Sequence, residues 1–426
     1  MKSQFFVLAM ICSGSVAHSQ TFDQDLLSPF SALGSGVTFG FADMSQSDEF
    51  NVTGPSVGFG LAAKIDSDDV APFYLEWSGS WAWGSNFTSS TEMQGSDAYV
   101  YAPRRSPVGT IDLSTEISAT GPTAAAAVQI TDNSGDTATI FSSAFSPFGT
   151  GNSVAQFATT MTDAGGIYAA LTTDGEAITA TSYGGMFDST GVSFMGTGNE
   201  SNTTTITTTV EDNIKFSNQV LYLSKRFSLD ENWILSPKIG PNYRSFDRSN
   251  TTRTTINIDG NRGSDSSIPT VTMEDNWKLN GKYYGAVLGA GLTRKINDAW
   301  SINFGAEAGL TKFNAKSETM ELVNFAGSAS AIPGERKSLN GTSRVGRLTG
   351  ALTHVAENGA IIVFGGYLDY MSDVPYLQFE TVGSPNITTA GSSVGLSGNG
   401  DTYRTHSIQK KKMIGSGLNL SIVFLF

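Results

Sequence analysis

The sequence has one cysteine, Cys12, and no long apolar run beyond its first residues. A membrane-spanning helix needs about 18 or more consecutive apolar residues, and no stretch after residue 19 supplies them. Without a second cysteine the chain forms no internal disulfide, so stability must come from packing and a hydrogen-bonded sheet. These two absences exclude a transmembrane helix bundle and a disulfide framework.

Basic residues and histidines are also scarce. The chain has 26 Lys and Arg against 39 Asp and Glu, a net charge of −13, and 3 His. This balance argues against a nucleic-acid partner. No phosphate loop, dinucleotide fingerprint or zinc spacing is present, and the segment 132–136 lacks the closing glutamate of a calcium loop. We therefore expect no cofactor and no metal site.

The first residues predict a secretory signal peptide over 1–19. Lys2 precedes an apolar run over 5–12, and Ala17, His18 and Ser19 offer small residues near a cleavage site. The mature chain would then cover 20–426 and would lose Cys12. A lipoprotein anchored through Cys12 is the alternative, and the bulky Ile11 before it disfavours that interpretation.

The last residues alternate between apolar and small or polar side chains. Leu418, Leu420, Ile422 and Phe424 alternate with Gly417, Asn419 and Ser421, and the chain ends on Phe426. A period of two predicts a strand with one apolar face. This ending resembles the C-terminal strand of bacterial outer-membrane β-barrels. The resemblance implies that the outer-membrane assembly machinery reads Phe426, Phe424, Ile422 and Leu420. An ordinary strand of a soluble β-protein remains the alternative.

The rest of the chain predicts an all-β fold, a transmembrane antiparallel up-and-down β-barrel of about ten strands, with twelve as the alternative. Abundant aromatic, Gly, Ser, Thr and Asn residues fit strands that face lipid on one side and a lumen on the other. The expected strands cover roughly 36–44, 56–65, 74–84, 214–229, 233–246, 278–296, 300–316, 344–356, 360–371 and the last residues before 426.

Connections between these strands alternate in length. The short ones are 65–73, 230–232, 297–299 and 357–359, and the long polar ones are 45–55, 85–213, 247–277, 317–343 and 372–402. Barrels of this class have short periplasmic turns and long extracellular loops. An even strand count therefore returns the C-terminus to the periplasm.

The short turns also predict a register. Each of the three-residue turns fixes which residues pair across its hairpin: the two residue numbers add up to 462, 596 or 716. All three sums are even, so paired residues are both odd-numbered or both even-numbered, and they face the same side of the sheet. Arg347 and Asp369 would then lie opposite each other. The inward positions collect charges of both signs: Lys64, Glu76, Lys238, Arg244, Glu307, Arg347 and Asp369.

These lumen charges allow two interpretations. Ten strands leave a narrow lumen, so the charges could pair as a salt-bridged plug. They could instead line a narrow polar pathway for ions or small solutes. Neutralising Lys238 or Glu307 and recording conductance separates the two.

The segment 85–213 is too long for an ordinary connection. It holds thirteen acidic residues and two basic ones, Arg104 and Arg105, with recurring short apolar clusters. A partly folded, β-rich extracellular cap is expected, either a constriction or a binding surface. The segment could also be a separate passenger domain, but residues 214–426 alone supply only seven strands.

No enzyme is expected. An omptin-type protease needs paired acids and an Asp–His couple at the outer rim, and a phospholipase needs a Ser–His couple. Only His406 lies near that rim, and His354 lies at the other end. We predict an outer-membrane protein of a Gram-negative bacterium that acts as a narrow porin-like channel. The alternative is a non-conducting, adhesin-like surface protein that binds an extracellular ligand through 85–213. Its other partners would be outer-membrane lipid and the assembly machinery, and a monomer is the default.

Overall fold

The computed structural model is built of strands alone in the part it describes. The described residues are 34–47, 49–65, 71–94, 99–105, 108–117, 123–131, 137–145, 153–159, 165–173, 178–187, 192–198, 203–259, 270–325, 328–356, 360–383, 386–390, 393–399 and 403–425. The side chains of residues 93–204, and those of a few residues elsewhere on the strands, are not described. The expected signal peptide and Phe426 lie outside these residues.

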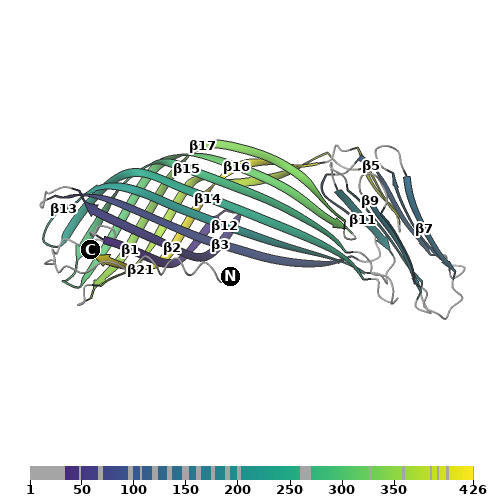
Figure 1. Cartoon of the computed structure of the whole chain (residues 1–426), viewed down its shortest axis with the longest axis horizontal. Helices are drawn as coiled ribbons and strands as arrows, with labels where there is room; N and C mark the ends of the chain where they lie inside the picture. Colours follow the sequence, from purple (N-terminus) through teal and green to yellow (C-terminus); the bar gives the residue numbers. More distant parts are fainter. Residues whose placement is uncertain are drawn as a thin grey trace.

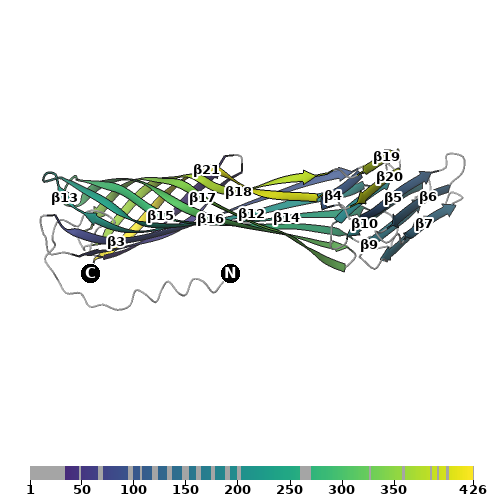
Figure 2. The same cartoon turned by 90° about the horizontal axis from the view of Figure 1, so that it is seen from above.

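Ten strands pair in chain order and close on themselves, because the first strand also pairs with the last. Every neighbouring pair is antiparallel, so the architecture is an up-and-down barrel, as predicted (Figures 1 and 2). One short extra strand, β13 (Phe227–Ser228), pairs with β14. The barrel strands are β1 (Gly34–Gln46), β2 (Phe50–Lys64), β3 (Phe73–Gln94), β12 (Thr203–Lys225), β14 (Trp233–Asp259), β15 (Val271–Lys295), β16 (Trp300–Phe325), β17 (Ser328–Val355), β18 (Ile361–Val382) and β21 (Tyr403–Leu425).

The predicted register is confirmed at each of the three hairpins. Val220 pairs with Asn242, Arg294 with Ile302, and Arg347 with Asp369. Two of the turns share one device: the side chains of Asp230 and Asn297 each accept hydrogen bonds from backbone N–H groups two and three residues on. Such Asx turns reverse the chain within a few residues.

An apolar band surrounds the outside of the barrel. It covers nine residues on several strands: 75–83 on β3, 235–243 on β14, 284–292 on β15, 362–370 on β18 and 414–422 on β21. Its large side chains are exposed, for example Leu288 at 66% and Leu418 at 63%. Nine tilted strand residues rise about 21 Å, close to the apolar height of outer-membrane barrels. This outer surface therefore fits a bilayer core. Among the described residues, no helix is long and apolar enough to cross a membrane.

Most strands run farther than predicted on the side away from the termini. The segments 45–55, 247–277, 317–343 and 372–402 were expected as long loops. Strands cover 45–46, 50–55, 247–259, 271–277, 317–325, 328–343, 372–382, 386–390 and 393–399 within them. The prediction of long loops there was wrong. The polar residues that suggested loops lie on strand faces exposed to water, where no apolar stripe marks the outer surface.

The connection between β3 and β12 also contains strands. β3 continues to Gln94 and β12 begins at Thr203. Between them lie β4 (Tyr99–Arg105), β5 (Val108–Ile117), β6 (Thr123–Thr131), β7 (Thr137–Phe145), β8 (Ser153–Thr159), β9 (Gly165–Thr173), β10 (Ile178–Phe187) and β11 (Val192–Gly198). Strands β19 (Asn386–Ala390) and β20 (Ser393–Asn399) join β5, β6 and β7 in a separate five-stranded sheet. These strands lie at the end opposite the C-terminus (Figure 1).

Candidate functional site

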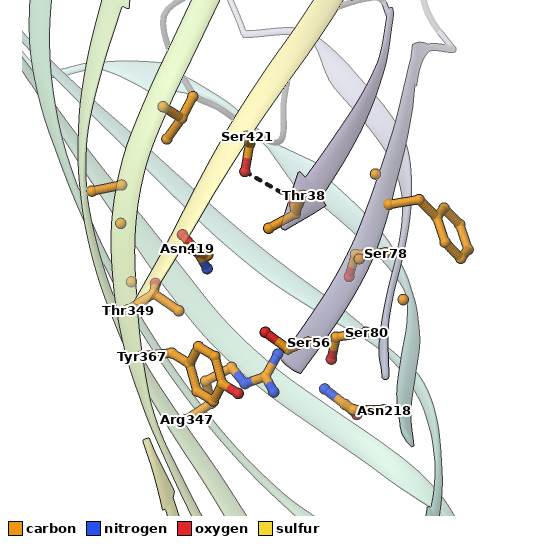
Figure 3. Close-up of a pocket in the computed structure, with 18 of the residues that line it drawn as sticks. Thr38, Ser56, Ser78, Ser80, Asn218, Arg347, Thr349, Tyr367, Asn419 and Ser421 are labelled. Carbon is orange, nitrogen blue, oxygen red and sulfur yellow. Dashed lines mark hydrogen bonds between the residues drawn. The ribbon is translucent and has the colours of Figure 1, made fainter. Parts of the chain in front are cut away.

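The interior of the barrel brings most of the predicted lumen charges together around a polar cavity of about 140 Å³. Side chains from β1, β2, β3, β12, β14, β16, β17, β18 and β21 face it, including Ser56, Ser78, Ser80, Asn218 and Asn419 (Figure 3). Thr38 and Ser421 join its two closing strands through a 2.8 Å hydrogen bond. Glycine and serine at inward positions of β2 and β3 are too small to fill this level, which leaves the cavity.

Glu307 forms the middle of the cavity wall. Its carboxylate accepts a hydrogen bond from the Tyr222 hydroxyl and lies 3.5 Å from the Lys238 ammonium. Glu307 pairs across the sheet with Gly289, where a Cβ atom would come within 2.8 Å of the Glu307 Cβ. The absent side chain at Gly289 therefore leaves the space in which Glu307 reaches its partners.

Asp369 lies between two arginines at the top of the apolar band. Arg347 donates two hydrogen bonds to one carboxylate oxygen, and Arg244 lies 3.2 Å from the other. Arg244 is fully buried and Asp369 is 3% exposed. The Arg244 Nε also donates to Asn242, which in turn donates to Asn218. Two cations share one buried carboxylate, so removing Asp369 would leave two buried positive charges uncompensated.

The remaining predicted charges lie closer to the short-turn end. Glu76 is buried and accepts a 2.5 Å hydrogen bond from Ser224. Lys64 ends β2, pairs across the sheet with Tyr74 and does not line the cavity. The structure therefore groups six of the seven predicted charges and leaves Lys64 at the rim.

Apolar side chains fill the interior at the top of the apolar band and above it. Phe246 and Leu279 are 0% exposed, and they belong to one cluster with the inward-facing aromatic residues Phe216, Tyr283 and Phe313. The cluster also includes Met44, Val345, Met371, Val374, Leu377, Ile408 and Met413 from the other strands. Packed interiors leave few voids larger than water. The interior is therefore closed at this level within the described residues.

A second layer of charge lies within the upper part of this apolar core, at the level of Leu279, with which Arg248 pairs across the sheet. Arg248 forms a bidentate pair with Asp212, with a shortest contact of 2.7 Å, and both are nearly buried. The Arg248 guanidinium packs between the rings of Phe50 and Trp277, 5.1 Å from each. The Arg248 side chain also donates to the Glu49 carbonyl in the β1–β2 turn. This layer fixes the short β1–β2 hairpin against the longer strands.

His406 is buried near the outer end instead of exposed at a rim. Its Nε2 lies 2.8 Å from the Ser317 hydroxyl, and its Nδ1 lies 3.6 Å from Glu335. Burial alone would raise the pKa of Glu335, but hydrogen bonds from Lys337 and Thr405 hold that pKa below its usual range.

The contacts from Ser317 to His406 and from His406 to Glu335 resemble those of a catalytic triad, in which a nucleophile contacts a base and the base contacts an acid. Ser317 is buried mid-strand and paired on both sides, with Leu279 and with Lys337. The neighbouring backbone N–H groups therefore serve the sheet and offer no oxyanion hole among the described residues. His354, at the short-turn end, stacks on Trp300 at 4.4 Å.

The residues of the expected assembly signal lie on the strand that closes the barrel. β21 pairs with β1 from Met413 to Leu425. Leu420 and Ile422 point outward and are 49% and 44% exposed. The Phe424 side chain and Phe426 are outside the described residues.

The sequence pattern did not reveal several residues that shape this interior. Tyr222 and Asn242 bind the predicted charges, and the apolar core closes the lumen above them. A signal was available: on β15 and β16 the apolar residues change to inward positions at Tyr283 and Phe313. Following both faces of each strand finds the inward residues of the apolar core.

Comparisons with known proteins identify no family. No protein-family model and no curated protein matches the chain. Among solved structures, the CymD monoaromatic hydrocarbon channel is 7% identical, covers 93% of this chain and 90% of its own, and has a TM-score of 0.21. The P. putida toluene transporter TodX is 9% identical, with coverages of 93% and 92% and a TM-score of 0.21. A Pseudomonas aeruginosa FadL homologue is 9% identical, with coverages of 92% and 89% and a TM-score of 0.20.

TM-scores this low carry no argument about substrate or mechanism. The architecture rests on the structure itself: a ten-stranded ring closed by β1 and β21, an exposed apolar band and short turns at one end. The chain is therefore a closed β-barrel of the kind found in bacterial outer membranes.

Proposed function

We propose that the chain is a non-conducting outer-membrane anchor that presents an extended β-structure outside the cell. One observation carries the proposal: buried apolar side chains fill the interior above the polar cavity. Phe246, Leu279 and Met371 are each 0% exposed there, although they come from three different strands of the ring. A water-filled pore needs polar, solvated inward positions at every level.

Ion pairs reinforce the closure at the lower edge of the apolar core and within its upper part. Asp369 with its two arginines lies at the lower edge, and Arg248 with Asp212 lies at the level of Leu279. Moving a hydrated ion past these layers would require breaking buried pairs, each of which costs several kcal/mol to disrupt. The charges therefore act as supports of a filled barrel in this proposal.

The strands beyond the apolar band are the part we propose to act on the surroundings. β14 continues to Asp259 and β16 to Phe325, well past the residues that face lipid. The connection between β3 and β12, residues 95–202, adds ten acidic residues against two basic ones. A protruding acidic β-structure suits contact with a basic or cation-rich partner. Its partner would be extracellular, and the barrel would be inserted by the outer-membrane assembly machinery of a Gram-negative cell.

A narrow pathway for ions or small solutes is the second candidate, and the polar cavity favours it. Glu307, Lys238 and Arg347 line about 140 Å³ in the middle of the barrel. Conduction would require the apolar core above this cavity to move aside. Two structural neighbours are described as a channel and a transporter, but that likeness is too weak to add support.

Two measurements test the proposal. Protease added to intact cells should cleave within 95–202 and leave the barrel strands intact, because only that side would protrude. Proteoliposomes containing the purified protein should exclude small sugars as well as protein-free vesicles do. Cleavage only after the outer membrane is permeabilised would overturn the surface presentation. Rapid sugar uptake would favour the pathway.

A variant lacking 100–198 separates the two roles of the molecule. The barrel strands that close the ring remain in it, so folding into vesicles should persist. Sugar exclusion that persists in this variant assigns closure to the barrel interior. Uptake that begins only after the deletion would assign closure to the long connection instead.

A further inference from the structure

The outward face of β15, β16 and β17 carries a cluster of basic residues just above the apolar band. We propose that this basic patch binds lipid head groups that carry more than one phosphate, in the leaflet on the side of the extended strands. The proposal goes beyond presentation of a surface structure and rests only on insertion of the barrel. The basic patch consists of Lys278, Lys282, Lys312, Lys316 and Arg344.

The side chains of the basic patch point away from the barrel. All five are exposed, while the residues next to them in sequence are buried in the interior. Lys282 lies between the buried residues Gly281 and Tyr283, and Ala315, beside Lys316, is 0% exposed. Strand side chains alternate between faces, so the five cations share the outer surface.

The height of the basic patch matches that of lipid head groups. Lys282 lies two residues beyond Tyr284, which is 57% exposed, and Lys312 lies two beyond Leu310, which is 61% exposed. These are the first outward charges above the apolar band on their strands. The polar head-group region begins where the hydrocarbon core ends, so these ammonium groups lie at its level.

The register places the five cations next to one another in a zigzag. Lys282 pairs with Asn314, whose neighbours on the same face of β16 are Lys312 and Lys316. Arg344 pairs with Leu310, one step below Lys312, and Lys278 pairs with Glu318, one step above Lys316. Diagonal neighbours on adjacent strands lie about 7–8 Å apart. Like charges at this spacing repel unless an anion lies between them.

The protein supplies little of that compensation itself. Within the described residues, none of the five cations has a carboxylate within 4.0 Å, whereas Glu318 is held by Arg336 at 2.5 Å. Asp247, on β14, is the nearest other acid in the register, opposite Asn280. The chain as a whole is acidic. The basic patch is therefore a local concentration of unpaired positive charge.

Phosphate groups fit this arrangement better than single carboxylates. A lysine acts as a point charge on phosphate, and an arginine can bind it with two parallel hydrogen bonds. Asn280 and Asn314 place amide groups between the cations. Five positive charges over three strands exceed the charge of one phosphodiester, so a head group with two or more phosphates neutralises them better.

The opposite end of the barrel offers a matched control. Arg294 is an exposed, outward cation on β15, at the short-turn side of the apolar band. Its guanidinium stacks on the Trp233 ring at 5.3 Å. It has the same charge at the other membrane surface, without cationic neighbours like those of the basic patch.

Native mass spectrometry of the full barrel in mixed micelles tests the proposal. The micelles contain phosphatidylcholine with equal amounts of bisphosphorylated lipid A or phosphatidylglycerol. Wild type should retain lipid A, and the triple variant Lys282→Gln, Lys312→Gln, Arg344→Gln should retain it about 100-fold more weakly. Arg294→Gln should behave as wild type. The unheated gel mobility of each variant verifies that the barrel has formed.

Three results would overturn the proposal. The triple variant could retain lipid A as well as wild type does. Phosphatidylglycerol could be held as tightly as lipid A. Inorganic pyrophosphate could displace lipid A at equal concentration, which would make the basic patch a site for free anions. Each readout is independent of conduction, so a conducting barrel would contradict the proposed function and leave this inference standing.

Discussion

The same ten strands have opposite polarity in two regions of the molecule. In the membrane region the outward side chains are apolar, as at Leu288 and Leu310, and the inward ones include Glu307 and Lys238. Above it the outward side chains include Lys282 and Lys312, and the inward ones are Leu279 and Phe313. The strands continue unbroken through the change. The medium that touches the outer face therefore decides which face is apolar.

The comparison also explains where the interior opens and where it closes. Inward positions of the membrane region hold small and charged residues, which leave a polar cavity. Inward positions above it hold large apolar residues, which leave none at the level of Phe246. Strand number alone would leave both regions equally wide. The large inward side chains above the membrane region therefore close the barrel there.

The largest effect is expected where the two regions meet. Asp369→Asn would leave Arg244 and Arg347 without their shared carboxylate in the buried interior. We expect a loss of about 4 kcal/mol in the free energy of unfolding, since uncompensated buried charges cost roughly 3–5 kcal/mol. Denaturant unfolding in lipid vesicles measures it. A loss below about 1 kcal/mol, the range of exposed pairs, would mean that these cations reach water.

The next effect tests the packing of the upper region. Phe246→Ala would remove a ring that is 0% exposed and leave a cavity in the apolar core. We expect a loss of about 3 kcal/mol, near the lower end of the range for Phe→Ala in cores. The same unfolding assay applies, with Phe87→Ala as the control because Phe87 is 66% exposed. Equal losses in both variants would contradict a packed core.

A third substitution tests the lipid-facing surface of the lower region. Leu288→Lys places a charge at the middle of the apolar band, where Leu288 is 66% exposed. We expect a loss of about 2 kcal/mol in vesicles, at the low end of the cost of a lysine at the bilayer midplane. Asn280→Lys, on the same strand and face above the band, should cost far less. If the two lysines cost the same, the membrane boundary lies elsewhere.

The smallest effect concerns an ion pair in water. Glu318→Gln removes the partner of Arg336, and both side chains are more than half exposed. Exposed pairs contribute about 0–1 kcal/mol, so unfolding should change by less than that. A loss comparable to that of Asp369→Asn would show that this part of the structure is shielded from water.

The membrane region was predictable because its pattern is simple. Alternation on 235–243 and 284–292 gave the correct face for each strand, and the turn residues gave the correct pairing of Arg347 with Asp369. The ends of the strands above it were missed: the predicted strands stopped at 278 and 316, whereas β15 begins at Val271 and β16 continues to Phe325. Beyond the change of apolar face at Tyr283 and Phe313, the outward residues are polar, so no outward apolar stripe marked the remaining strand residues.

The closure of the interior was not predictable from the charges alone. Opposite partners follow from hairpin register, so Arg347 and Asp369 could be paired from sequence. Arg244 and Asp369 lie on strands that are far apart in the ring order, and only the three-dimensional fold brings them within 3.2 Å. Tyr222 and Glu307 also lie on strands that are not neighbours in the ring, and only the fold brings them together across the cavity.

Planar-bilayer recording of the purified protein tests the closed interior most directly. We expect no conductance steps from wild type or from Glu307→Gln, because the apolar core at Phe246 and Met371 blocks the interior whatever the charge below it. Steady conductance steps in wild type, with an ion selectivity that changes in Glu307→Gln, would contradict the closed barrel and establish the narrow pathway.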